Sequence, residues 1–206
     1  MTENKDARKP LIYVVDDDRG VRDSLSLLLR SVGIENEAYE SAAAFLAAYR
    51  TGRVACLIVD ISMPGMSGLE LQDELNRRHI SLPIIFITGH GDVPMAVTAM
   101  KAGAVDFLPK PFRDQELLDR VTAALGKAAS EFADEQHAID VRARYGSLTP
   151  REAEVMAKVV AGCANKVIAM DLGVSQRTVE LHRARVMQKM AVRSLAELVR
   201  LAEVLD

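Results

Sequence analysis

Residues 55–71 read ACLIVDISMPGMSGLEL, and they carry the strongest indication of the fold class. The run from Ala55 to Val59 is apolar or small and leads directly into Asp60, which is typical of a short buried strand ending at a charged side chain. Gly65 and Gly68 come next and predict a tight loop in which the backbone can approach a bound group. The spacing of the leucines after this loop predicts an amphipathic helix.

The same alternation continues on both sides of this stretch. Further short apolar runs that predict strands are Leu11–Val15, Ile34–Tyr39, Ile84–Thr88 and Val105–Leu108. The segments between them carry apolar residues at helical spacing, among them Val21 with Leu25 and Val97 with Met100. Strands that alternate with helices predict an α/β fold with a five-stranded, doubly wound parallel sheet. In such a sheet the functional groups gather at the carboxyl ends of the strands.

Carboxylates follow two of these predicted strands. Asp16 and Asp17 end the first strand, and Asp60 ends the third. Because these strands are expected to be neighbours, three carboxylates converge, which is unfavourable unless a cation is bound. Oxygen ligands without Cys or His favour a hard cation, so the sequence predicts a Mg²⁺ site.

Two further polar groups follow the remaining strands. Thr88 ends the fourth strand and can donate a hydrogen bond to a phosphoryl oxygen, and Lys110 follows the fifth and can neutralise one. Each of these residues taken singly is common as a helix cap or a surface side chain. Their joint occurrence at successive strand ends favours a functional site instead.

The remainder of the chain has a different pattern. Residues 126–146 are rich in Ala and charged side chains, which favours a helical linker continuous with the fifth predicted helix, and a flexible coil is the alternative. From Leu148 onward every segment is helical in pattern. Thr149 before Pro150 predicts a capped helix start, and further helices are predicted at 164–172, 175–190 and 194–205.

Composition limits the class of protein. Hydrophobic residues make up 49% and charged residues 27%, which is ordinary for a globular protein. Cys56 and Cys163 have no metal-site spacing and are expected to be buried thiols. The polar N-terminus and the lack of a long apolar run predict neither a signal peptide nor a membrane contact, so we expect a cytoplasmic protein. Residues 165–193 hold six basic and two acidic side chains, which favours nucleic acid as a partner.

The motifs VVDDD, IVDISMPGMSG, FITGHGDVPMAV and KAGAVDFLPKPF resemble the signature blocks of bacterial receiver domains. Residues 148–190 resemble a LuxR-type helix-turn-helix domain, so nearly the whole chain is similar to response regulators of the FixJ/NarL type. The resemblance implies a flavodoxin-like receiver at 1–126, a linker at 127–146 and a DNA-binding domain at 147–206. It also implies a regulator of transcription rather than an enzyme.

The resemblance assigns roles to the strand-end residues. Asp60 would accept a phosphoryl group from a sensor histidine kinase, and Thr88 and Lys110 would contact the phosphoryl oxygens. Mg²⁺ would be held by Asp16, Asp17, Asp60 and the main-chain carbonyl of Ser62. Many relatives have Arg where this chain has Ser62, so the lifetime of the phosphoryl group is expected to differ. A cis peptide bond is expected between Lys110 and Pro111.

The resemblance also implies a switch. Thr88 and Phe107 would couple phosphorylation to a surface change, although Phe107 by residue type alone reads as a plain core aromatic. A homodimer would then form through the fourth helix, where Val97 and Lys101 are the contact candidates. His90 reads as a surface loop residue.

The predicted helix at 175–190 would read DNA in the major groove. Residues expected to meet base edges are Arg177, Glu180, Leu181 and Arg185. Residues expected to contact phosphates are Lys166, Thr178, His182, Arg183, Lys189 and Arg193. A solvated basic helix face is the alternative for all of them. Promoter DNA and RNA polymerase are the expected partners of this domain.

Two other functions are compatible with parts of the pattern. A Mg²⁺-dependent phosphatase with an Asp nucleophile is one, but such enzymes usually carry a second Asp at the position of Ser62. A constitutive DNA-binding protein with an inert front domain is the other, and the intact set of strand-end residues argues against it.

Overall fold

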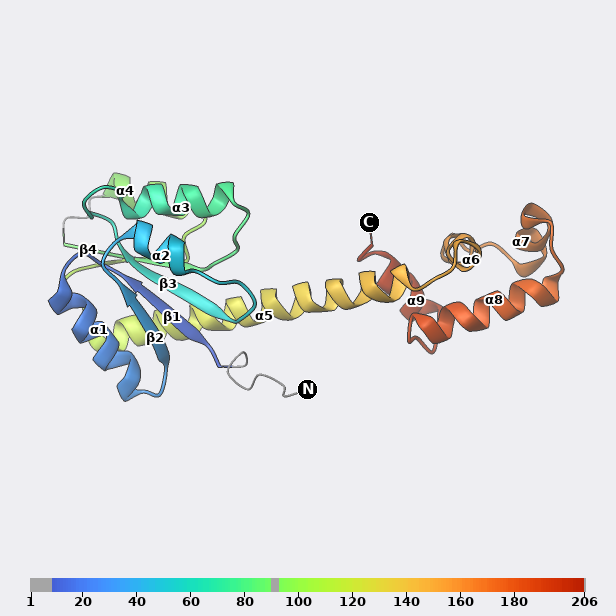
Figure 1. Ribbon diagram of the computed structural model, residues 1–206, viewed down its shortest axis with the longest axis horizontal. Helices are drawn as coiled ribbons and strands as arrows, with labels where there is room; N and C mark the ends of the chain where they lie inside the picture. Colours follow the sequence, from blue (N-terminus) through green and yellow to red (C-terminus); the bar gives the residue numbers. More distant parts are fainter. Residues whose placement is uncertain (1–8, 90–92, 206) are drawn as a thin grey trace. The chain divides into compact units, whose positions relative to one another are not determined.

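The computed structural model describes residues 9–89 and 93–205 of the chain. The chain forms two compact units that divide after Phe132, and each is described by itself (Figure 1). Within the described residues, no helix has both the length and the apolar character needed to cross a bilayer.

The first unit is built on a five-stranded parallel sheet in the order β2-β1-β3-β4-β5. Its strands are β1 Leu11–Val15, β2 Glu35–Tyr39, β3 Ala55–Asp60, β4 Ile84–Thr88 and β5 Asp106–Pro109. Val15 lies beside Val59, and Asp60 lies beside Ile87. Asp16, which follows β1, and Asp60, the last residue of β3, therefore lie at the same edge of the sheet. The predicted doubly wound α/β fold is confirmed.

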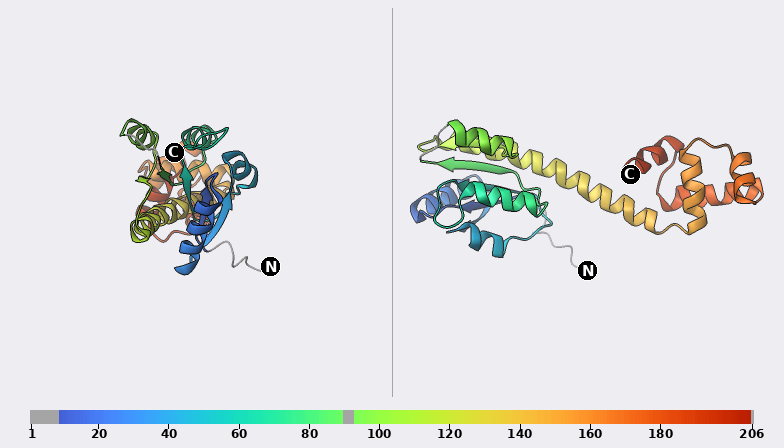
Figure 2. Two further views of the ribbon diagram at one scale, coloured as in Figure 1. Left: turned by 90° about the vertical axis from the view of Figure 1, so that its left-hand side faces the viewer. Right: turned by 90° about the horizontal axis from the view of Figure 1, so that it is seen from above.

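Helices cover both faces of this sheet (Figures 1 and 2). Helices α1 (Arg19–Ser31) and α5 (Asp114–Gly146) lie on one face, while α2 (Ala42–Ala48), α3 (Gly68–Arg77) and α4 (Val93–Lys101) lie on the other. Alternate strand residues supply the two cores because successive side chains of a strand point to opposite faces. Ile58 of β3 packs with Leu29 and Leu117, whereas Val59 packs with Phe45 and Leu71.

Helix α4 differs from the pattern expected of an amphipathic helix. Val97 and Met100, whose spacing predicted the helix, are 45% and 46% exposed. Ala99 is fully buried instead, and Ala104 beyond the helix end is buried as well. Ala99, together with the partly buried Met95, therefore makes the contact between α4 and the body of the unit, while Val97 and Met100 remain on the surface.

Helix α5 is continuous over 33 residues and includes all of 127–146, the stretch expected to link two domains. Its first half supplies Leu117, Val121 and Ala124 to the sheet core of the first unit. Its second half supplies Val141 to the core of the second unit. Residues 133–137 between them are exposed.

The second unit contains four further helices, α6 (Pro150–Val160), α7 (Asn165–Leu172), α8 (Gln176–Lys189) and α9 (Leu195–Ala202). Helix α6 starts with the predicted cap, in which the Thr149 hydroxyl accepts from the Glu152 backbone N–H and the Glu152 side chain accepts from the Thr149 backbone N–H. Gly173 ends α7 with φ +64°, a left-handed conformation that allows the tight turn into α8. Each predicted helix of this part is present, within a few residues of the expected bounds.

Candidate functional site

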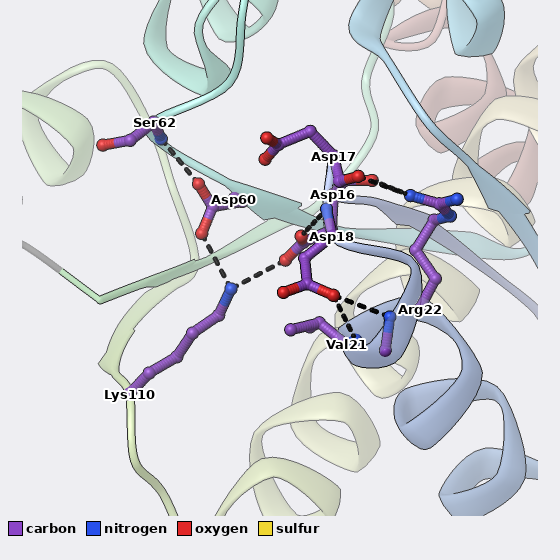
Figure 3. A network of polar contacts seen from close by, with 9 residues as sticks. Asp16, Asp17, Asp18, Val21, Arg22, Asp60, Ser62 and Lys110 are labelled. Carbon is purple, nitrogen blue, oxygen red and sulfur yellow. Dashed lines mark hydrogen bonds and ion pairs between the residues drawn. The ribbon is translucent and has the colours of Figure 1, made fainter.

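Two carboxylates and one ammonium group meet at the carboxyl edge of the sheet (Figure 3). Lys110 Nζ lies 2.7 Å from Asp16 Oδ2 and 2.9 Å from Asp60 Oδ1. Asp16 is 1% exposed and Asp60 is 5% exposed, so Lys110 bridges two nearly buried anions. Because charge-assisted hydrogen bonds are the stronger class, this bridge holds the three side chains in one arrangement.

Burial and ion pairing shift the pKa values of Asp16 and Lys110 in opposite directions. Burial raises the pKa of the Asp16 carboxyl above its ordinary value, and the hydrogen bond from Lys110 offsets only part of this effect. Partial burial of Lys110 lowers the pKa of its ammonium, but the hydrogen bonds to Asp16 and Asp60 outweigh it and raise the pKa overall. Lys110 is therefore a permanent cation at neutral pH, placed where negative charge is concentrated.

The loop after β3 holds Asp60 from its backbone. The Ser62 backbone N–H donates to Asp60 Oδ2 at 2.7 Å. Gly65 has φ +80°, so the loop requires a residue without the usual steric limits. A Cβ atom on Gly68 would collide with the Asp60 carbonyl oxygen, because the start of α3 lies directly against the end of β3. Gly68 thus allows α3 to lie against the backbone of Asp60, whereas Gly65 has open space around it.

Asp17 and its neighbours form the outer side of the site (Figure 3). Asp17 is exposed, and Arg22 donates to the main-chain carbonyls of Asp16 at 2.8 Å and Asp17 at 3.0 Å. Asp18 caps α1 by accepting from the backbone N–H of Gly20. Sequence reasoning missed both Asp18 and Arg22, although an Asp directly before a helix is a typical cap signal.

The carboxylate and carbonyl oxygens at this edge are the kind of ligand that a hard cation prefers, but the described carboxylates do not form a complete metal-binding cluster. Within residues 9–89 and 93–205, no three His, Cys, Asp or Glu side chains are grouped closely enough to hold a metal ion. Asp16 and Asp60 both face Lys110, while Asp17 stays at the surface with its carboxylate exposed. The set of ligand atoms fits Mg²⁺, which keeps several waters and needs only one or two protein carboxylates.

The residues expected to form the switch lie on the neighbouring strands. Thr88 is fully buried at the end of β4, and its carbonyl accepts from the Lys110 backbone N–H at 2.7 Å. The Lys110–Pro111 peptide bond is cis, as expected. Phe107 of β5 is half-buried and packs against the core shared with α3 and α4. Val97 and Lys101 are exposed on α4, and His90 lies outside the described residues.

The residues expected to contact DNA separate into two groups in the second unit. Those with exposed side chains are Lys166, Arg177, Glu180, Leu181, Arg185 and Arg193. Those that are partly buried are Thr178, His182, Arg183 and Lys189.

Three of the partly buried residues have side-chain partners inside the unit, and the first is Thr178, whose hydroxyl shares a hydrogen bond with the Ser175 hydroxyl at 2.8 Å. Arg183 donates to Asn165 Oδ1 at 2.7 Å. Lys189 donates to Glu152 Oε2 at 2.7 Å and to the Ser147 carbonyl at 2.9 Å. Arg183 and Lys189 thus hydrogen-bond α8 to the neighbouring helices α7 and α6.

Both units match known families. Residues 12–122 match the response regulator receiver domain, and residues 146–202 match the bacterial regulatory proteins of the luxR family. The chain belongs to the response regulators. The receiver match includes Asp16, Asp60 and Lys110, and the luxR match includes the whole of α8.

Relatives of this response regulator resemble it over nearly their full length. Nodulation protein W of Bradyrhizobium diazoefficiens is 48% identical over 197 residues, which cover 96% of this chain and 87% of that protein. Transcriptional regulatory protein FixJ of Azorhizobium caulinodans is 50% identical over 191 residues, which cover 93% and 90%. The solved structure of the response regulator StyR is 47% identical, covers 95% of this chain and 98% of that chain, and has a TM-score of 0.87.

This response regulator therefore combines a receiver with a LuxR-type DNA-binding domain and acts as a regulator of transcription. The family membership favours this function over a phosphatase or a DNA-binding protein with an inert front domain.

Proposed function

We propose that Asp60 accepts a phosphoryl group from the phosphohistidine of a sensor kinase. One Asp60 carboxylate oxygen forms a bond to phosphorus as the P–N bond breaks, and the electron pair of that bond leaves with the imidazole nitrogen. The product is an acyl phosphate on Asp60. The observation that carries this proposal is the bridge from Lys110 to both Asp16 and Asp60, at 2.7 and 2.9 Å.

The residues around Asp60 divide the work of charge neutralisation and positioning. The Lys110 ammonium donates a hydrogen bond to Asp60 and would donate one to a phosphoryl oxygen after the transfer. Thr88, the last residue of β4, would donate a hydrogen bond from its hydroxyl to a second phosphoryl oxygen. The Ser62 backbone N–H orients the Asp60 carboxylate. This division suits phosphoryl transfer, which depends on positioning and electrostatics more than on covalent help.

Mg²⁺ is the cofactor that these ligands fit. Asp16, Asp17, Asp60 and the main-chain carbonyl of Ser62 would hold it, and a bound Mg²⁺ would neutralise charge on the transferred group. Asp17 is suited to this role because it is exposed and meets the solvent, from which a hydrated cation arrives.

Phosphorylation of Asp60 would then change the surface of α4. Thr88 and Phe107 lie on the adjacent strands β4 and β5, which α4 connects, and their rearrangement would alter the α4 surface. Val97 and Lys101 would contact a second copy of the chain there, giving a homodimer. A two-state element biased by a local charge is a sufficient physical basis for such a switch.

DNA binding is proposed for α8, with Lys166 of α7 and Arg193 beyond the end of α8 as additional phosphate contacts. Arg177 and Arg185 are exposed and can each pair with guanine. Promoter DNA, a histidine kinase and RNA polymerase are the proposed partners of a cytoplasmic, non-enzymatic regulator. The proposed domains are a receiver at 1–126, a linker at 127–146 and the DNA-binding domain at 147–206.

Labelling by acetyl phosphate tests the acceptor directly. The wild-type chain should take up one phosphoryl group in the presence of Mg²⁺, and Asp60→Asn should take up none. Asp23→Asn is the matched control because Asp23 is an exposed carboxylate on α1. Full labelling of Asp60→Asn would refute the assignment.

A further inference from the structure

A buried amide side chain joins α3 to α4. Gln72 is 1% exposed, and its Nε2 donates to the Ala99 carbonyl of α4 at 3.1 Å. It lies on the buried face of α3 with Leu71 and Leu75, where an apolar side chain would be the ordinary choice. Within the described residues its Oε1 is buried without a hydrogen-bond partner. Since burying an unpaired polar atom is costly, packing alone does not account for Gln72.

A second amide repeats the contact one helical turn later. Asn76 Nδ2 donates to the Ala102 carbonyl, just beyond the end of α4, at 3.1 Å. The last carbonyls of a helix have no partner within the helix itself. The Ala99 carbonyl also accepts from the Ala104 backbone N–H at 3.0 Å, so Gln72 supplies its second hydrogen bond. Gln72 and Asn76 together form what we call the amide clamp. The clamp fixes the C-terminal end of α4 to α3 at two points.

The N-terminal end of α3 is fixed to the loop that follows Asp60. The Gly68 backbone N–H donates to the Ile61 carbonyl at 2.9 Å, and Gly68 leaves no room for a Cβ against the Asp60 backbone. The reciprocal cap between Ser67 and Glu70 stiffens the first turn of the helix. One ten-residue helix thus lies against Asp60 at its start and holds α4 near its end.

We propose that the amide clamp positions the exposed face of α4, formed by Val97, Met100 and Lys101, for phosphorylation-dependent pairing with a second copy of the chain. Gln72 and Asn76 act as positioning residues, because they touch neither the phosphoryl group nor the partner. The inference rests on the proposed dimer face. With the clamp intact the face is held in one place before pairing, so less ordering is needed when the dimer forms.

Gln72→Met is the main test because methionine keeps the length of the side chain while removing both the donor and the unpaired Oε1. Replacing a buried polar group by an apolar one of similar shape can leave stability nearly unchanged. Gln136→Met is the matched control, since Gln136 is exposed on α5. Asn76→Ala is the second variant, and because Asn76 is exposed its loss leaves the core intact.

Two measurements on the full-length chain separate the clamp from its consequence. The first is hydrogen exchange at the backbone amides of 102–104, where Ala104 N–H donates to the same Ala99 carbonyl at 3.0 Å. We expect about threefold to tenfold faster exchange in both clamp variants, as for the loss of one hydrogen bond. The second is the dimer dissociation constant after acetyl phosphate labelling, which should rise by a similar factor while the extent of labelling stays at the wild-type level.

Each outcome decides the inference. Faster exchange with weaker pairing supports it, and wild-type exchange in both clamp variants overturns it. Faster exchange with unchanged pairing also overturns it, because the clamp would then be structural only. A wild-type chain that is fully labelled but remains monomeric refutes the proposed dimer face itself, and this result is visible without any clamp variant.

Discussion

Lys189 near the end of α8 donates to the carboxylate of Glu152 in the first turn of α6, with Nζ 2.7 Å from Oε2. The same carboxylate accepts from the Thr149 backbone N–H at 2.9 Å as part of the α6 cap. Glu152 is 2% exposed, so one nearly buried anion both caps α6 and ties it to the proposed DNA-reading helix. The orientation of α8 therefore depends on an ionised carboxylate.

This dependence predicts acid sensitivity of the second unit. The Lys189 hydrogen bond and the Thr149 backbone N–H lower the pKa of Glu152 from 4.5 to about 2. A carboxyl whose pKa is lower in the folded state stabilises the fold fully above its unfolded pKa, and this contribution is lost as pH falls toward the folded value. The protection of the α6 and α8 amides against hydrogen exchange should therefore decline between about pH 4.5 and about pH 2.

Glu152→Gln isolates the charge because glutamine also completes a helix cap at this position. The variant should be less stable than the wild type at neutral pH, and the difference should shrink as the pH is lowered through this window. Glu154→Gln, on the exposed side of the same helix, is the control. A constant difference between Glu152→Gln and the wild type across the whole range would contradict the role given to the carboxylate.

Gly68→Ala should destabilise the first unit. Its Cβ would meet the Asp60 carbonyl oxygen and, at 3.1 Å, the Phe86 ring, neither of which can move freely in the core. Overpacking of this kind costs about 1–3 kcal/mol. Gly126→Ala, in an open position of α5, should instead raise the free energy of unfolding by about 0.5–1 kcal/mol. Urea unfolding followed by circular dichroism measures both, and equal stability of the two variants would show that α3 does not press on the acceptor strand.

Lys110→Ala should slow labelling of Asp60. Removal of the ammonium leaves Asp16 and Asp60 facing each other without the cation that bridges them. A charge-assisted hydrogen bond contributes about 1.5–3 kcal/mol, so the rate of labelling by acetyl phosphate should fall by about tenfold to a hundredfold. Lys127→Ala removes an exposed ammonium of α5 and should leave the rate unchanged. Labelling of Lys110→Ala at the wild-type rate would exclude a role for the bridge.

The sequence predicted the strand ends well because two simple rules apply to them. Buried parallel strands are short apolar runs, and their carboxyl ends share one edge, so Asp16, Asp60 and Lys110 could be expected to meet. Contacts between helices follow no such rule. The position of Gln72 on α3 gives its face but not its partner Ala99, and the pairing of Lys189 with Glu152 depends on a helix crossing that spacing does not reveal.

Arg177→Ala and Arg185→Ala test the proposed orientation of α8 on DNA. Both side chains are exposed on this helix, and an Arg that pairs with guanine contributes about 1–3 kcal/mol to discrimination between bases. On a duplex selected by the wild-type protein from a random pool, each variant should bind about fivefold to 150-fold more weakly, and it should tolerate more bases at one position. Lys166→Ala, which removes a proposed phosphate contact, should weaken binding to all sequences alike and reduce its salt dependence. Arg200→Ala on α9 is the control for loss of an exposed charge. Wild-type affinity and selectivity in both Arg177→Ala and Arg185→Ala would mean that another face of α8 enters the groove.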